Sequence, residues 1–382
     1  MTPCLSPVSA VLPGRRRRRS RRPVFAALVG DSWQPLSALR ARELRQLLLD
    51  SGASVDGLFD KEALLSAALL LQANMRTPAA SRGVETPLVF MDAASLVTGV
   101  RTSQAPHAAL RVTTAGGATL CFVLDTAAST SIVLPAVAAR LRLPRTGVTA
   151  GSGVSGTGRT AETYQVALGE LRSVPGGELL VPNQLAVVLD LPTGDGTDGL
   201  LGLDFCSAFD ALELVWSPPA VTLHARGSFT AASWAATAKG LSECLLSPVS
   251  GGLLALRVIP AGSRVELLAI VDTGAAFTTI NCAAAAALGL RGEDTAQTTW
   301  VTGLGGRPLA VRTAERDLQL EGVVSTAGAA AAPIGSVRPL IGDLPAFAQF
   351  GLGASPACIL GLDAIMQRPR VVMSTSTRRM LF

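Results

Sequence analysis

The stretch FVLDTAASTSIVLP, residues Phe122 to Pro135, sets the acid Asp125 directly after three apolar residues and surrounds it with small side chains. Acidic side chains are rarely placed in apolar surroundings unless they are paired or used in chemistry. The arrangement recurs at Asp272, and VLDTAASTSIVLPAVAARLRL aligns with IVDTGAAFTTINCAAAAALGL without a gap. The acid therefore belongs to a repeated unit.

A second block of the repeat follows each acid. The segment LLGLD, Leu200–Asp204, matches ILGLD, Ile359–Asp363, after a longer connection in the second half. The extra residues are assigned to the Ala- and Gly-rich segment 325–336, which is interpreted as a surface loop. The acids Asp204 and Asp363 are expected to face solvent or to cap the turn that follows.

Short apolar runs separated by Gly, Thr and Pro turns make up most of each half, which is typical of β-strands. One helix-prone segment follows each acid, at residues 136–143 and 283–290. Two copies of so long a unit are too few for a solenoid. The sequence predicts a mostly β fold with two pseudo-symmetric β lobes, preceded by a small helical hairpin module.

Composition supports a globular chain whose basic charge is concentrated at its start. Of 382 residues, 48% are hydrophobic and 16% charged, and the net charge falls from +5 to −2 once the seven arginines before residue 23 are left out. A start rich in Arg, Ser, Pro and Ala and without acids resembles a transit peptide, here residues 1–30. We expect a chloroplast location, with the mitochondrion as the alternative; a nuclear localisation run or a nucleic-acid arm would also fit.

Residue usage narrows the possible chemistry. The six cysteines form no CxxC pair and there are two histidines, so neither a disulfide framework nor a metal centre is expected, and no cofactor is predicted. The longest apolar runs are too short for a membrane-spanning helix. Carboxylates remain as the groups able to do chemistry.

Residues 34–72 show leucines at helical spacing on both sides of a Gly-containing turn. The segment ELRQLLLDSGASVDGLFDKEALLSAAL resembles the SAP-like helical module, which implies binding of a protein partner; a simple helical spacer is the alternative. Acids nearly balance the basic residues there, so nucleic-acid binding is not expected. Residues 73–105 are interpreted as a linker and entry strand.

The pattern apolar-apolar-Asp-Thr-Gly/Ala-Ala, then a Gly-rich turn, then apolar-apolar-Gly, occurs twice and resembles the lobes of the pepsin and retroviral protease superfamily. The chain is similar to two-lobed, retropepsin-like aspartyl proteases of the plant and algal kind. The resemblance implies lobes at residues 106–228 and 251–382, joined by a connector at 229–250. It implies an aspartic endopeptidase acting on a protein or peptide substrate.

Two carboxylates can hydrolyse a peptide without a metal, because one takes a proton from water while the other gives one to the carbonyl. Held about 3 Å apart, they cannot both ionise and share one proton. Asp125 and Asp272 are the predicted catalytic pair. The resemblance implies that Thr126 and Thr273 tie the two active-site loops together.

Glycine and alanine residues near the two acids are expected to control how closely the backbone packs around them. Gly274 lets the backbone approach a carboxylate closely. Its counterpart Ala127 adds a methyl group at a crowded turn, and the two alternatives are that the turn tolerates it or that it displaces Asp125 and impairs the pair. Gly202 and Gly361 are expected to let the second block pass beneath each loop.

The turns 151–159 and 301–308 are predicted flaps over an extended substrate, and the only tyrosine, Tyr164, lies beyond the first turn. Their flap residues are Gly153, Ser155, Gly156, Gly303, Gly305 and Gly306. Ala128 and Ala275 lack the hydroxyls found there in pepsin-like enzymes, which predicts a less acidic pair and work at mildly acidic to near-neutral pH. The competing hypothesis is a catalytically weak protein that binds peptides or proteins.

Overall fold

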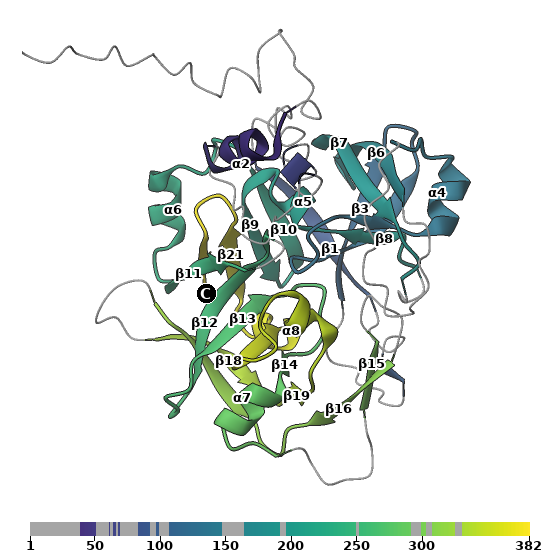
Figure 1. Cartoon of the computed structure of the whole chain (residues 1–382). Coiled ribbons are helices and arrows are strands. Elements are labelled where there is room, and N and C mark those ends of the chain that lie inside the picture. The colour runs from purple at the N-terminus through teal and green to yellow at the C-terminus, as the bar shows by residue number, and fades with distance from the viewer. Residues whose placement is uncertain are drawn as a thin grey trace, which may run out of the picture.

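The computed structural model describes residues 39–50, 61, 64, 65, 68, 83–91, 97–98, 107–146, 164–191, 196–249, 252–291, 299–302, 308–324 and 331–382. Within them the chain is mostly β, as predicted, with short helices at the edges of two β lobes (Figure 1). The predicted transit peptide and most of the predicted helical module lie outside these residues. So do the predicted flap residues, namely Gly153, Ser155, Gly156, Gly303, Gly305 and Gly306.

The first lobe is built around a hairpin whose second strand leads to Asp125. Its strands are β3 (His107–Thr114), β4 (Thr119–Leu124), β5 (Ile132–Val133), β6 (Tyr164–Ser173), β7 (Leu179–Val188) and β8 (Gly199–Leu201). Strand β4 pairs antiparallel with β3 and parallel with β8. Fully buried Phe122 and Leu124 alternate along β4, so this strand is anchored in the core up to the residue before the acid.

The second lobe repeats this arrangement, with β13 parallel to β20 as β4 is to β8. Its strands are β12 (Leu254–Pro260), β13 (Leu267–Val271), β14 (Thr279–Ile280), β16 (Pro308–Thr313), β17 (Leu318–Gly322), β18 (Ala332–Val337), β19 (Leu340–Ile341) and β20 (Ala357–Leu360). Segment 325–336 was predicted as a surface loop, which is wrong for its second part. Strand β18 pairs there with β17 and buries Ile334.

Helices follow both acids, where the sequence predicts them. Helix α4 (Pro135–Leu141) begins with a proline, which suits the first helical position, and ends at Arg142 in the left-handed conformation. Helix α7 (Cys282–Ala287) begins after Asn281, whose side chain accepts a hydrogen bond from the Ala284 N–H at 2.8 Å. The second block of each repeat continues into α5 (Leu203–Cys206) and α9 (Leu362–Ile365), and α8 (Pro345–Gln349) precedes the latter.

One sheet joins the two lobes, in the strand order β1–β10–β9–β21–β22–β11. Its strands are β1 (Val84–Met91), β10 (Pro219–Ala225), β9 (Phe209–Trp216), β21 (Arg370–Ser374), β22 (Arg379–Leu381) and β11 (Glu243–Pro248). The halves of the sheet correspond, because β1 continues from β10 onto β3 as β11 continues from β22 onto β12. The segments interpreted as linker and connector therefore each supply a strand of the fold, and the connector also forms α6 (Ala231–Thr237).

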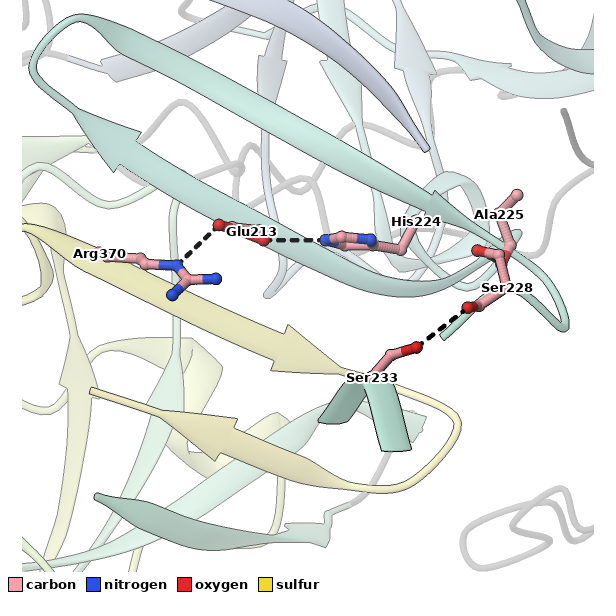
Figure 2. Close-up of polar contacts among 6 residues, drawn as sticks. All are labelled: Glu213, His224, Ala225, Ser228, Ser233 and Arg370. Atoms are coloured by element: carbon pink, nitrogen blue, oxygen red, sulfur yellow. Dashed lines mark hydrogen bonds and ion pairs between the residues drawn. The ribbon is translucent and has the colours of Figure 1, made fainter. Parts of the chain in front are cut away.

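Glu213 lies at the centre of this sheet and links the two lobes (Figure 2). Its carboxylate accepts a hydrogen bond from the Arg370 Nε on β21 at 2.7 Å and lies 2.9 Å from the His224 Nε2 on β10. These partners lower the pKa of Glu213 to about 2, since each stabilises the ionised carboxylate. The ionised form of Glu213 therefore strengthens the junction.

Three further elements complete the described chain. A hairpin of β15 (Thr299–Thr302) and β16 flanks the predicted flap turn of the second lobe, and β2 (Val97–Thr98) pairs with β15. Helix α2 (Ala41–Asp50) lies within the predicted helical module and buries Leu44 and Leu47. In the described part of the chain, no helix has the length and apolarity needed to cross a membrane.

Candidate active site

The two acids of the repeat occupy equivalent points, where the central strand of each lobe leaves its sheet. The Asp125 N–H donates to the Leu201 carbonyl at 2.9 Å, and the Asp272 N–H donates to the Leu360 carbonyl at 3.1 Å. These bonds continue the parallel pairing of β4 with β8 and of β13 with β20. The backbone of each acid is therefore held by the second block of its own repeat.

Each carboxylate is oriented by the turn that follows it. Asp125 Oδ1 accepts the N–H groups of Ala127 and Ala128, both at 2.9 Å. Asp272 Oδ1 accepts those of Gly274 at 2.8 Å and Ala275 at 2.9 Å. One oxygen of each acid is thus bound to backbone, and the two side chains also hydrogen-bond to each other. The structure brings the predicted catalytic pair together.

Asp125 is buried and Asp272 is partly buried, and burial raises the pKa of both groups. The pKa of Asp272 lies well above its ordinary value, through burial first and the neighbouring charge of Asp125 second. Burial also raises the pKa of Asp125, but the hydrogen bonds from Ala127, Ala128 and Asp272 oppose that rise. The pair therefore retains a shared proton above the pH at which an ordinary aspartate loses it.

The threonines after the acids bind across the lobe boundary. The Thr126 hydroxyl donates to the Val271 carbonyl at 2.7 Å, and the Thr273 hydroxyl donates to the Leu124 carbonyl at 2.6 Å. Each hydroxyl also accepts the N–H of the other threonine at 3.2 Å. All of these groups are buried, so an unpaired partner would be costly. The reciprocal bonds fix the spacing of the two loops.

Gly274 lies directly against the Asp125 side chain. A Cβ added at Gly274 would lie 2.5 Å from Asp125 Cγ and 2.7 Å from its Oδ2. The equivalent residue of the first loop, Ala127, is partly buried and carries the methyl group that Gly274 lacks. The two halves of the site therefore share their hydrogen bonds and differ in the space beside the carboxylates.

The model of the Aspartyl protease family matches residues 110–205 and 258–364, one stretch in each lobe. The chain belongs to the aspartyl protease family. Both matched stretches contain an acid of the pair and the second block that supports it. The family thus spans both lobes of the fold.

Two solved structures matched the chain in a structural comparison. Basic 7S globulin from soybean matches with a TM-score of 0.42 and 11% identity, over 79% of this chain and 94% of that one. Conglutin gamma from lupine seeds matches with a TM-score of 0.40 and 12% identity, over 79% and 94% of the two chains. No curated protein matched the chain in a sequence comparison.

The second block of each repeat packs tightly under the active-site loop of its own lobe. A Cβ added at Gly202 would lie 2.7 Å from the Ala128 carbonyl oxygen, and one at Gly361 would lie 2.6 Å from the carbonyl carbon of Phe277. Real Cβ contacts of that length are essentially absent from proteins. Only glycine fits at either position without movement of the loop backbone.

The expectation that Asp204 and Asp363 face solvent is wrong. Asp204 is 4% exposed and accepts the Ser131 hydroxyl at 2.7 Å, and Asp363, partly buried, accepts the Thr278 hydroxyl at 2.6 Å. The same hydroxyls accept the N–H groups of Gly202 and Gly361. Each acid lies inside the lobe because it accepts a hydrogen bond from a buried hydroxyl of the active-site loop, which needs an acceptor. Ser131 and Thr278 each lie six residues after the acid of their own lobe. Alignment of the two repeats could therefore have indicated these hydroxyls as partners of the second block.

Two further side chains of the first lobe, Gln184 and Tyr164, have defined partners. Gln184 on β7 donates to both Ser131 and Asp204 in the first lobe. Tyr164, at the start of β6, lies under the Arg145 guanidinium at 3.8 Å from the ring centre. Across the described residues, no group of three or more acids, histidines and cysteines could hold a metal ion.

Proposed function

We propose that this member of the aspartyl protease family is an aspartic endopeptidase, of the plant and algal kind, that cleaves peptide bonds with Asp125, Asp272 and a water molecule. The observation that carries the proposal is the hydrogen bond between two carboxyl groups of opposite lobes, Asp125 buried and Asp272 partly buried, each oriented by two backbone N–H groups. Such a pair contains a base and an acid at one place.

A pair that shares one proton supplies both catalytic roles. The ionised member takes a proton from water as the oxygen attacks the peptide carbonyl, and the protonated member donates its proton to the carbonyl oxygen. Collapse of the tetrahedral intermediate then transfers a proton to the leaving amine, and the pair returns to its singly protonated state.

A catalytically weak protein that binds peptides is the second candidate. Ala127 favours it, because its methyl group stands where the second loop has Gly274, the residue that makes room for a carboxylate. On this alternative the paired acids keep the fold of the site while cleavage is slow. The two candidates differ in turnover and share the capacity to retain extended peptides through strand-like hydrogen bonds.

The test is cleavage of a peptide library by the full chain, with and without pepstatin. We expect inhibited cleavage by the unmodified protein and a loss of about 10³-fold in Asp125→Asn and in Asp272→Asn, since each removes one member of an acid–base pair. Circular dichroism should show unchanged folding of both variants. Retention of peptides without cleavage would establish the binding alternative instead.

Location and partners are part of the proposal. The composition of residues 1–30 supports import into a chloroplast, with the mitochondrion as the alternative. The resemblance of residues 34–72 to the SAP-like module, together with helix α2, supports a protein partner for that segment. A fluorescent fusion of residues 1–30 in plant cells tests the location. Loss of a co-purifying protein on deletion of 34–72, with cleavage retained, tests the partner.

A further inference from the structure

Gln184 on β7 places a side-chain amide beneath the first active-site loop. It is 6% exposed, and its Nε2 lies 3.0 Å from Asp204 Oδ2 and 3.1 Å from Ser131 Oγ. The same atom donates to the Leu185 carbonyl at 2.8 Å. Acceptors surround this atom, which identifies it as the nitrogen of the amide. A buried amide is costly unless it is paired, so these contacts account for its place inside the lobe.

The second lobe has valine at the equivalent place. Strand β5 pairs with β7 through Val187, as β14 pairs with β19 through Leu340. Gln184 lies three residues before Val187, and Val337 lies three residues before Leu340. Val337 is 4% exposed and belongs to the core of its lobe. Packing alone would therefore favour an apolar side chain at this place in both lobes.

The carboxylate of Asp204 accepts hydrogen bonds at both of its oxygens. Oδ2 accepts from Gln184, and Oδ1 accepts the Ser131 hydroxyl at 2.7 Å and the Phe205 N–H at 2.9 Å. The Ser131 oxygen also accepts the Gly202 N–H at 3.0 Å, so its single hydrogen is committed to Asp204. Burial raises the pKa of Asp204, and the hydrogen bonds from Ser131 and Gln184 oppose that rise. The network therefore needs a donor at position 184.

Backbone hydrogen bonds continue from this network to the catalytic pair. Gly202, held by the Ser131 hydroxyl, is followed by Leu203, whose N–H donates to the Ala128 carbonyl at 2.7 Å. The N–H of Ala128 donates in turn to Asp125 Oδ1 at 2.9 Å. The position of this catalytic carboxylate thus depends on a chain of buried contacts that begins at the amide.

The corresponding acid of the second lobe is held without an amide. The Thr278 hydroxyl and N–H both donate to Asp363 Oδ1, at 2.6 and 2.9 Å. In the part of the chain that the structure describes, no side-chain amide binds the Asp363 carboxylate. The exposed amide of Gln367 donates to the backbone carbonyls of Asp363 and Ser336 instead. Gln367 is therefore a matched amide that does not touch the carboxylate.

We propose that Gln184 is a positioning residue of the catalytic pair, whose amide fixes Asp204 and Ser131 and through them holds the first active-site loop where Asp125 meets Asp272. This inference rests on the proposed endopeptidase function. Gln184 does not touch the reacting atoms and acts through the loop. Its loss should therefore lower turnover more than substrate binding.

The first experiment needs no catalysis. Hydrogen exchange followed by mass spectrometry compares the full chain with its Gln184→Met and Gln367→Met variants. We expect the peptides that contain Ala128 and Leu203 to exchange about 10-fold faster in Gln184→Met, because the contacts that protect these N–H groups are weakened. Peptides from the second active-site loop should keep their exchange rates. First-loop peptides that exchange in Gln184→Met as in the unmodified chain would overturn the proposal.

The second experiment measures kcat and KM of the same two variants, with the active sites counted by pepstatin titration. We expect kcat of Gln184→Met to fall by about 10-fold with KM within about twofold, since a displaced catalytic group slows the chemical step. Gln367→Met should keep both constants. A merely structural role would reduce the number of active sites and leave kcat per site unchanged, and that result would overturn the proposal.

A third variant, Gln184→Glu, keeps the size of the side chain and makes the donor depend on pH. Its carboxylic acid donates to Asp204 while it is protonated, whereas two ionised carboxylates at this distance repel each other. We expect kcat to match the unmodified protein near about pH 5 and to fall about 10-fold below it by about pH 8. The Cys206 thiol on α5 does not interfere, because burial and the charges of Asp204 and Asp125 raise its pKa. A profile parallel to that of the unmodified protein would contradict the role of the donor.

The experiments separate the two proposals. If the unmodified chain cleaves no peptide but Gln184→Met speeds exchange in the first loop, the endopeptidase proposal fails and the support of the loop by Gln184 stands. If the chain cleaves peptides but neither exchange nor kcat changes in Gln184→Met, the role of Gln184 is wrong and the endopeptidase proposal stands. Gln184→Glu retains a donor in acid, so a Gln184→Met variant that fails to fold leaves the third test intact.

Discussion

The loop Asp125–Thr126–Ala127 of the first lobe and the loop Asp272–Thr273–Gly274 of the second make the same hydrogen bonds but leave different space. Both acids accept two N–H groups from their own turn, and both threonines donate across the lobe boundary. The glycine makes room for Asp125, whereas the alanine adds a methyl group on the other side. Backbone symmetry thus coexists with chemical asymmetry, and the two acids can take different roles.

The largest effect is expected from exchanging the two small residues. Gly274→Ala would place a methyl carbon 2.5 Å from Asp125 Cγ. We expect it to lower kcat/KM by at least about 10²-fold, since small displacements of a catalytic group are that costly. The converse change, Ala127→Gly, should maintain or raise activity. Steady-state kinetics of both variants check the pair, and total loss of activity in Ala127→Gly would mean that the methyl group supports the loop.

The supports beneath the loops should differ between lobes. Ser131 is held in a network with Asp204 and Gln184, whereas Thr278 binds Asp363 without such an amide. We expect Ser131→Ala to lower the free energy of unfolding by about 2–3 kcal/mol and Thr278→Val by about 1–2 kcal/mol, because each leaves buried polar groups unpaired. Urea unfolding measures both. Equal losses would remove this difference between the lobes.

The junction between the lobes should weaken in acid. The pKa of Glu213 is lowered to about 2 in the folded chain, so its stabilising effect is present above its unfolded pKa of about 4.3 and is lost as the pH falls toward 2. We expect Glu213→Gln to cost about 2 kcal/mol near neutral pH and much less near pH 2. Thermal unfolding across this range checks the sign. A constant cost at every pH would mean that charge is not the cause.

The smallest effect is expected at the alanines that follow the turns. Adding hydroxyls with Ala128→Ser and Ala275→Thr should supply hydrogen bonds to the ionised pair and shift the pH profile of kcat toward acid by about half a unit. The single variants indicate which lobe sets the titration. Ala275 is the more open position, because Ala128 is buried and Ala275 only partly so. A double variant with an unmoved profile would show that other groups set the pKa of the pair.

Repetition alone made much of this molecule predictable. Asp125 and Asp272, followed by LLGLD and ILGLD, predicted from the sequence alone two β lobes and the pairing of the acids. The helices after the acids were also predictable, because proline and asparagine start them locally. Such signals reside in neighbouring residues or in the comparison of one half with the other.

Contacts between distant strands were decided by the tertiary structure. The linker was predicted to contain an entry strand and the connector none, yet β1 and β11 both extend a sheet across the two lobes because strands from distant parts of the chain offer them edges. The burial of Asp204 was not predicted, because a carboxylate is normally exposed and its partner Ser131 is known only from the fold. The sequence by itself determined the repeat and the acids, whereas folding decided which polar groups are buried, because burial depends on residues that meet only after the two lobes pair.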